Sequence, residues 1–297
     1  MMNLFTPPPE TEWNVLNLGA GVQSSALALM AAHGDITPAP DFAVFADTQA
    51  EPTEVYDWLD TLRELINKAP HPFPIYTVTK GNLTDEQLKI RIREKDAESG
   101  GKKGDTYIKR LIPVFGIHNG ERTAAIGRKC TYDYKVQAIL KEIKSLCSVK
   151  RGQKDVTVTQ WIGISWDEMQ RAREASHKWT QHRWPLLETK ITRTECINWM
   201  NKMGYPKPPR SACYYCPFHS DHEWRRLRDN DPEHFQKAIE FDKELRQKFK
   251  KHDTIMQMEV YLHNSCKPLD QVDFDNDEDK GQMTWDFQAE CEGMCGL

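Results

Sequence analysis

A glycine-bearing loop between an apolar stretch and a helix is the feature that most constrains the fold of this chain. Residues 15–18 are mostly apolar, residues 19–25 read Gly-Ala-Gly-Val-Gln-Ser-Ser, and residues 26–32 favour a helix. This order predicts a strand, a tight loop and a helix, with backbone N–H groups and a helix N-terminus available to an anion. The loop matches neither the dinucleotide pattern nor the ATPase pattern that ends in Gly-Lys-Ser/Thr. An ordinary strand-to-helix turn is therefore the alternative.

Further strands and helices follow in alternation. Residues 42–46 form a second apolar strand candidate, residues 52–69 an amphipathic helix, and residues 74–78 and 156–164 two more strand candidates. Such alternation predicts a doubly wound, mainly parallel α/β sheet, which is the Rossmann-like class, with helices on both faces.

Two regions are predicted from changes in composition along the chain. We expect a first domain over residues 1–205, with a charged, glycine-containing and mobile insertion at about 80–129. A smaller, helical and cysteine-bearing region is expected over 206–297, with a helix at about 232–250 and an acidic linker at 273–279.

Composition excludes several classes of protein. The formal net charge of −4 is too small to imply a dedicated acidic or basic partner. No stretch approaches the 18 or so apolar residues of a membrane span, and the first residues lack the pattern of a signal peptide. Eight cysteines without such a signal indicate thiols, metal ligands or redox groups rather than disulfides. We therefore expect a cytoplasmic protein without a membrane partner.

Four segments resemble the phosphoadenosine phosphosulfate reductase family of the adenine nucleotide alpha-hydrolase, or PP-loop, superfamily. The ATP-pyrophosphatase branch of that superfamily carries Ser-Gly-Gly-x-Asp-Ser, where this chain has Gly19, Ala20, Gly21, Gln23 and Ser24 at the five named positions. The glutamine in place of aspartate resembles the phosphosulfate reductase branch. Three later segments also resemble that branch, so the resemblance covers residues 13 to about 220 and is weakest across the insertion; the segments are residues 46–56, 161–171 and 184–187.

The resemblance implies an adenine nucleotide whose phosphates lie on the loop from Gly19 to Ser25. Asp47 would then lie at the carboxyl end of the second strand, where open α/β sheets bind ligands; its alternative is a turn or capping carboxylate. Lys135 and Arg171 would contact the phosphate or sulfonate groups, and solvated surface charges are the alternative. Arg128 and Lys129 are further candidates of the same kind.

Three cysteines are candidate ligands of a metal centre. Cys213 and Cys216 form a Cys-x-x-Cys pair, whose two thiolates can reach one metal ion or one cluster edge. The segment around Cys130 resembles the cysteine segment of cluster-containing adenylylsulfate reductases, which implies a 4Fe-4S cluster. Those reductases have an adjacent cysteine pair where this chain has Lys129 and Cys130, so a fourth ligand is missing.

The missing ligand leaves three alternatives. Another cysteine supplies it, or one iron stays open, as in cluster-dependent tRNA thiolation enzymes of the superfamily, or the metal is zinc with a histidine as fourth ligand. The candidate cysteines are Cys196, Cys291 and Cys295, and the candidate histidines are His219 and His222.

A cysteine near the end of the sequence is the candidate nucleophile. Cys291 lies in a segment that partly resembles the Glu-Cys-Gly tail of sulfonucleotide reductases, although Glu292 intervenes and the following Leu-His pair is absent. In those enzymes the tail cysteine attacks the sulfate sulfur, and a second thiol then releases sulfite. Cys295 is a candidate for that second thiol. The alternative is that both cysteines are metal ligands or inert.

Three functions follow from these patterns. The first is a phosphosulfate reductase-like enzyme that needs a thiol reductant. The second is an ATP- and magnesium-dependent sulfurtransferase that adenylates and thiolates tRNA or DNA, favoured by Ser24, by the incomplete tail and by the aromatic and basic run at residues 224–228. The third is a non-catalytic nucleotide- or nucleic-acid-binding module. Lysines on the insertion, such as Lys102 and Lys103, indicate either a lid or a solvated loop.

Overall fold

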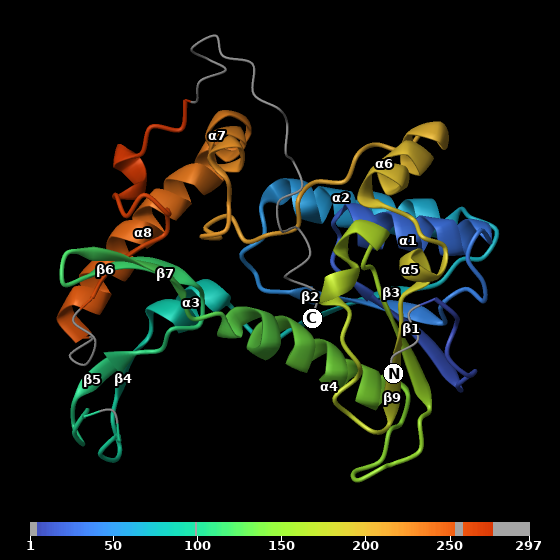
Figure 1. The fold of residues 1–297 in the computed structure, drawn as a ribbon, viewed down its shortest axis with the longest axis horizontal. Coiled ribbons are helices and arrows are strands. Elements are labelled where there is room, and N and C mark those ends of the chain that lie inside the picture. Colours follow the sequence, from blue (N-terminus) through green and yellow to red (C-terminus); the bar gives the residue numbers. More distant parts are fainter. Residues whose placement is uncertain (1–4, 99, 253–257, 276–297) are drawn as a thin grey trace.

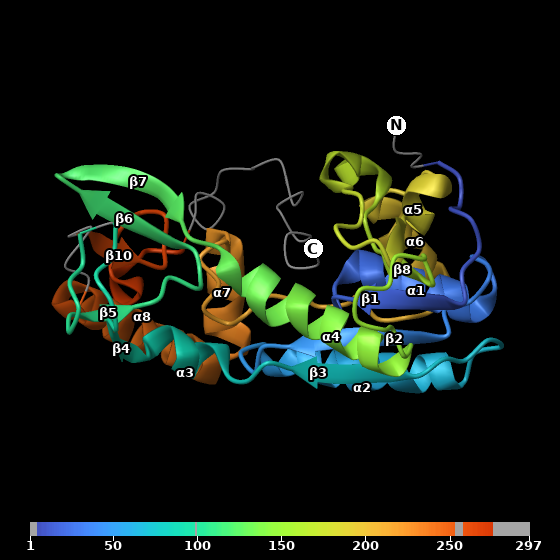
Figure 2. The ribbon, with the colours of Figure 1, turned by 90° about the horizontal axis from the view of Figure 1, so that it is seen from below.

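The computed structural model describes residues 5–98, 100–252 and 258–275, which form two lobes. Figure 1 shows a sheet lobe, built around β1, and a second lobe around α8; Figure 2 shows the same division from below. No helix in these residues is long and apolar enough to cross a membrane.

The sheet lobe contains five parallel strands in the order β3-β2-β1-β8-β9. Leu16 of β1 is aligned with Ala43 of β2 on one side and with Trp161 of β8 on the other. This topology confirms the predicted doubly wound α/β fold. The strands are β1 (Trp13–Leu18), β2 (Phe42–Asp47), β3 (Ile75–Thr79), β8 (Val158–Ile162) and β9 (Thr180–Arg183).

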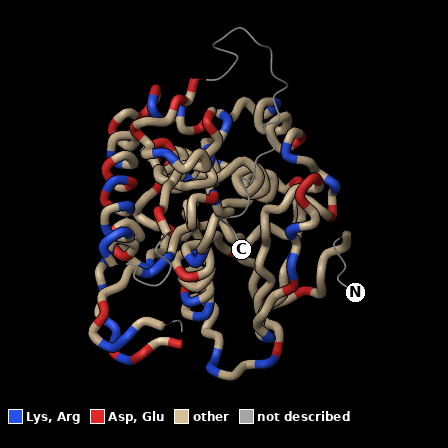
Figure 3. The backbone as a smooth tube through the Cα atoms, turned by 60° about the vertical axis from the view of Figure 1, so that its left-hand side comes forward, with Lys and Arg blue, Asp and Glu red and all other residues tan. Residues whose placement is uncertain are grey.

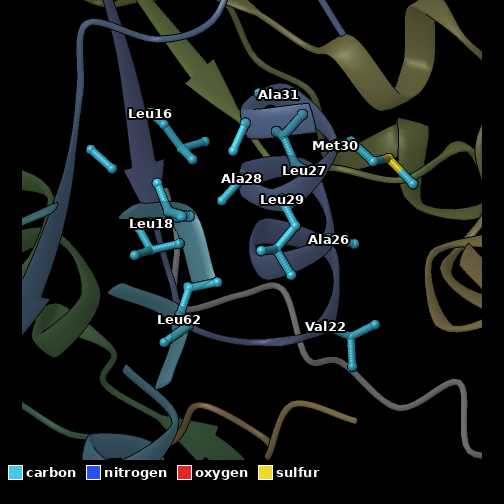
Figure 4. Packing of buried hydrophobic residues seen from close by; sticks show 14 of the residues in the cluster. Leu16, Leu18, Val22, Ala26, Leu27, Ala28, Leu29, Met30, Ala31 and Leu62 are labelled. Carbon is cyan, nitrogen blue, oxygen red and sulfur yellow. The ribbon is translucent and has the colours of Figure 1, made fainter. Parts of the chain in front are cut away.

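Both faces of the sheet are covered by helices because alternate strand residues point to opposite faces. Leu16 and Phe45 belong to a core with α1 (Val22–His33), α2 (Thr53–Asn67) and α6 (Arg193–Lys202). Figure 4 shows Leu16, Leu18 and Leu62 gathered beside α1. Val15 and Val44, which precede Leu16 and Phe45 in the sequence, belong to a separate core on the opposite face, with α4 (Gln137–Leu146).

The chain reverses its direction of travel across the sheet at β1. From β1 it passes to β2 and β3, with α1 and α2 on one face, and it later returns through α4 on the other face to β8. The connections that leave β1 and β8 therefore diverge at the carboxyl edge of the sheet. Such a topological switch point is where open α/β sheets bind ligands.

The second lobe combines the segment at 80–129, which was expected to be an insertion, with the C-terminal region. Val114 and Ile112 from this segment share one core with Trp224, Phe241 and Val260. A strand of the C-terminal region completes the sheet β10-β6-β7. The short apolar stretches of residues 80–129 are thus buried against α8, which lies far away in the sequence. The elements are α3 (Leu83–Leu88), β4 (Ile90–Ile92), β5 (Thr106–Ile108), β6 (Val114–His118), β7 (Glu121–Ile126), α7 (Asp221–Asn230), α8 (Pro232–His252) and β10 (Glu259–Tyr261).

The two lobes meet at the loop that follows β2. Backbone N–H groups of Tyr214 and Leu83 donate to the carbonyl oxygens of Ala50 (2.9 Å) and Thr48 (3.1 Å). Residues 131–136 form a π-helical turn, η1 (Thr131–Val136), which leads directly into α4 and contacts β2. The carboxyl edge of the sheet therefore faces the region that carries Cys130 and Cys213.

Candidate functional site

The loop from Gly19 to Ser25 is closed by the side chain of Ser24. Its Oγ accepts a hydrogen bond from the Gly19 N–H (3.2 Å) and donates to the Gly21 carbonyl (3.3 Å). Ala20 has a φ of 59°, and Gly21 is the extended residue that precedes the first turn of α1. Local hydrogen bonds thus hold the loop at the helix N-terminus, where an anion is stabilised.

The side chain of Ser25 lies in the core and has a structural role. It is fully buried, and its hydroxyl accepts a hydrogen bond from the indole Nε1 of Trp58 (2.9 Å). This contact fixes α1 against α2. The side chain of Ser25 is therefore oriented toward the core, although it was predicted to bind the nucleotide.

The backbone of Gly163, which follows β8, passes close to Ser24 of the loop. A Cβ atom added to this glycine would lie 3.0 Å from the Cα and 3.1 Å from the backbone N of Ser24. From the sequence, Gly163 was only one residue of a segment that resembles the reductase branch, and no role was predicted for it. Its signal is a glycine at the end of a buried strand, a position where two backbones pass closely.

A polar network connects the loop to the segment after β8, η2 (Trp166–Arg171). The Gln23 Nε2 donates to Glu168 Oε2 (3.1 Å) and lies 3.5 Å from Ser165 Oγ. Arg171 donates to the same Glu168 oxygen at 2.7 Å. Because an ionised carboxylate only accepts hydrogen bonds, Gln23 must present its NH₂ group to Glu168 and turn its carbonyl oxygen away. The structure thus brings Gln23 and Arg171 together, as the resemblance implies, and adds Glu168.

The network predicts the effect of a Glu168→Gln variant. For the anionic adenine nucleotide that the resemblance implies, removing the carboxylate charge beside Arg171 is expected to raise the affinity by about fivefold, since a like charge several ångströms away costs about 1 kcal/mol. Isothermal titration calorimetry measures this change. Glu174→Gln, which removes a charge from an exposed residue of the next loop, is the control and should leave the affinity unchanged. Equal or weaker binding by Glu168→Gln would contradict the arrangement.

Asp47 lies at the carboxyl end of β2, as predicted, and is hydrogen-bonded both within its own turn and to α2. Its Oδ1 accepts from the Gln49 N–H (2.7 Å) and from the Tyr56 hydroxyl (2.9 Å). Burial, and then this hydrogen bond to the carboxylate, raise the pKa of Tyr56, so the phenol remains a donor. These contacts are those of a turn carboxylate at the ligand-binding edge of the sheet.

Lys135 is engaged by a buried carboxylate. Its Nζ lies 3.1 Å from Glu51 Oε1, and the side-chain exposures are 10% for Lys135 and 0% for Glu51. The Thr48 hydroxyl lies 3.4 Å from the Cys213 sulfur and 3.5 Å from Glu51 Oε1. Lys135 is therefore part of the contact between the lobes, beside Cys213.

The environment of Cys213 disfavours its thiolate. Burial raises the pKa of the Cys213 thiol well above its ordinary value, and the negative charge of Glu51 raises it further, whereas the nearby Lys135 lowers it. Without a bound metal, the group is consequently a protonated thiol at neutral pH.

The predicted metal ligands do not form a complete set in the described residues. Cys213 and Cys216 share a tight turn, in which the Cys216 N–H donates to the Cys213 carbonyl (2.9 Å). Cys130 and Cys213 both pack against the core of the second lobe. Yet in this part of the chain no three His, Cys, Asp or Glu side chains are arranged to hold a metal ion. A metal centre on Cys130, Cys213 and Cys216 therefore stays a prediction.

The candidates for a fourth ligand are in different environments. Cys196 is fully buried in the core beside α1, in the sheet lobe. His219 packs on Trp224 with ring centroids 4.7 Å apart, and burial lowers the pKa of this histidine well below its ordinary value. His222 is exposed in the first turn of α7. Cys291 and Cys295 lie outside the described residues.

The aromatic and basic run at residues 224–228 is largely structural. Trp224 is fully buried in the second core. Arg226 forms a 2.6 Å ion pair with Glu54 of α2, and Arg228 is paired with Asp229 and Asp275. Arg226 thus joins the two lobes, and the charges of Arg226 and Arg228 are paired with carboxylates.

Comparisons of this chain with protein-family models, with curated proteins and with solved structures found no match.

Proposed function

We propose that the chain is an adenine-nucleotide-binding enzyme of sulfur chemistry, similar to phosphoadenosine phosphosulfate reductases. The observation that supports the proposal is the loop closed by Ser24, held against Gly163 at the switch point between β1 and β8. Backbone N–H groups of this loop and the N-terminus of α1 would hold the phosphates.

The charges around the loop favour a phosphosulfate over ATP with magnesium. Gln23 supplies an amide where the ATP-pyrophosphatase pattern has a carboxylate, and the amide is tied to Glu168. Glu168 is in turn neutralised by Arg171. A metal-nucleotide complex is favoured by carboxylate and water ligands, and the carboxylates of Glu168 and Asp47 already accept hydrogen bonds within the protein.

The proposed reaction uses Cys291 as the nucleophile. Its thiolate attacks the sulfur of the phosphosulfate, an S–S bond forms, and the bond from sulfur to the phosphate oxygen breaks, which releases the adenosine bisphosphate. A second thiolate, from Cys295 or from an external thiol reductant, then attacks the Cys291 sulfur. This step releases sulfite and leaves a disulfide, so the thiols are oxidised and the sulfonate sulfur is reduced.

An ATP-dependent sulfurtransferase is the second candidate. The observation that favours it is Ser24, which the ATP-pyrophosphatase pattern also carries and which organises the loop here. In this case the nucleic acid would receive the sulfur after adenylation. A 4Fe-4S cluster or zinc on Cys130, Cys213 and Cys216 stays part of either proposal, and metal and sulfide analysis of the anaerobically purified protein with its Cys213→Ser variant tests it.

Calorimetric titration of the anaerobically purified full-length protein separates the two functions. Phosphoadenosine phosphosulfate and ATP with magnesium are titrated separately. We expect tighter binding of the phosphosulfate, and loss of sulfite release in a Cys291→Ala variant whose nucleotide affinity is unchanged. Tighter binding of ATP would support the second candidate, and binding of neither nucleotide would refute both.

A further inference from the structure

A short hairpin at the end of the second lobe carries a concentration of positive charge. Its described residues are 89–98 and 100–110; it pairs β4 with β5 and lies at the lower left in Figure 1. This segment contains eight Lys and Arg against four Asp and Glu, a net charge of +4 in a chain whose total is −4. Figure 3 marks the basic positions in blue along the backbone. The charge is therefore distributed unevenly over the molecule.

Four lysines of the hairpin are exposed and, within the described part of the chain, form no ion pair. Two acidic side chains of the hairpin are used otherwise: the carboxylates of Asp96 and Asp105 accept hydrogen bonds from the backbone N–H groups of Lys103 (2.8 Å) and Lys102 (2.7 Å). These bonds shape the tip of the hairpin and leave the ammonium groups in solvent. The four lysines are Lys95, Lys102, Lys103 and Lys109.

The hairpin also presents planar and apolar groups beside the charges. The Arg93 guanidinium lies over the ring of Tyr107, 4.7 Å from its centroid. At the edge strand β4, Ile92 is 68% exposed and Ile90 is 43% exposed. Edge strands usually carry charges that prevent pairing with other chains, so exposed isoleucines that alternate with basic residues are better explained by a partner that is both anionic and partly apolar.

We propose that this hairpin binds the phosphate backbone of a nucleic acid. A nucleic acid combines closely spaced phosphates with apolar base faces, which matches the lysines of the tip and the exposed Ile92. The binding site lies in the second lobe, apart from the nucleotide loop in the sheet lobe. The inference therefore does not depend on which nucleotide the loop binds.

Fluorescence anisotropy with labelled duplex DNA, duplex RNA and single strands of each tests the proposal on the full-length protein. A Lys102→Glu/Lys103→Glu variant is expected to bind at least about tenfold more weakly. The slope of log affinity against log salt should become shallower by about 2, since each phosphate contact contributes about 0.9 on a DNA duplex and about 0.7 on a single strand. An Ile92→Ser variant should lower the affinity while leaving the slope unchanged.

A matched control changes the same charge elsewhere. Lys150 and Lys154 are exposed in the loop before β8, in the sheet lobe, and Lys150→Glu/Lys154→Glu should retain the affinity and slope of the wild type. Equal loss in both double variants would show that only total charge matters and would overturn the assignment. No binding to any of the four nucleic acids, or binding to anionic lipid vesicles in their place, would also overturn it.

Discussion

Replacing Gly163 with alanine is expected to weaken nucleotide binding by at least about tenfold, which corresponds to about 1.4 kcal/mol. The added Cβ would meet the Cα and backbone N of Ser24 at 3.0 and 3.1 Å, closer than ordinary contacts. Backbone atoms cannot rotate away as a flexible side chain would. The loop must therefore shift by a few tenths of an ångström, and hydrogen bonds to phosphate oxygens are sensitive to such shifts.

The affinity of Gly163→Ala is measured by calorimetry with the nucleotide that the wild type prefers, and urea unfolding measures its stability. Gly19→Ala is the matched control, because its Cβ would lie 3.6 Å from Ser24 Oγ, an ordinary contact. We expect the control to bind several-fold more tightly than Gly163→Ala. If both variants bind as the wild type does, the close approach of Gly163 does not shape a binding loop.

The sheet lobe was predictable from sequence because its signals are local. The strand at residues 42–46 is an unbroken apolar run, and the loop after residue 18 joins a strand directly to a helix. Each such unit carries its own pattern, and a parallel sheet follows from their alternation. The strand order was not predicted, because it places β1 beside β8 and so aligns Trp13 with Val158, far away in the sequence.

The second lobe was not predictable in the same way because its core joins residues far apart in the chain. Gly116 is aligned with Val260, and the two are separated by the whole return through the sheet lobe. Residues 80–129 consequently look like a charged insertion when they are read alone. A single sequence gives no signal for this pairing.

The candidate site was predicted by residue type, while its internal contacts were not. Gln23 and Arg171 could be named from the resemblance, but the carboxylate of Glu168 that connects them could not, since a side-chain contact across 145 positions leaves no local pattern. Lys135 was expected to meet an anion of the ligand. The structure pairs it with Glu51, because a buried ammonium group requires a carboxylate within the protein.

Replacing Lys135 with methionine is expected to lower the free energy of unfolding by about 3–5 kcal/mol. The variant removes the partner of Glu51, whose side chain is fully buried, and an uncompensated buried charge is strongly destabilising. The Thr48 hydroxyl, 3.5 Å from Glu51 Oε1, compensates little of that loss. Urea unfolding followed by circular dichroism measures the change.

The double variant Glu51→Gln/Lys135→Met distinguishes a buried pair from general disruption of the contact between the lobes. Removing both charges removes the desolvation cost as well, so the double variant should regain most of the stability that Lys135→Met loses. The exposed pair of Lys68 and Glu64 on α2, 3.3 Å apart, provides the control. Lys68→Met should change the stability by no more than about 0.5 kcal/mol. A double variant as unstable as Lys135→Met would mean that packing around Cys213, and not the charge of Glu51, sets the cost.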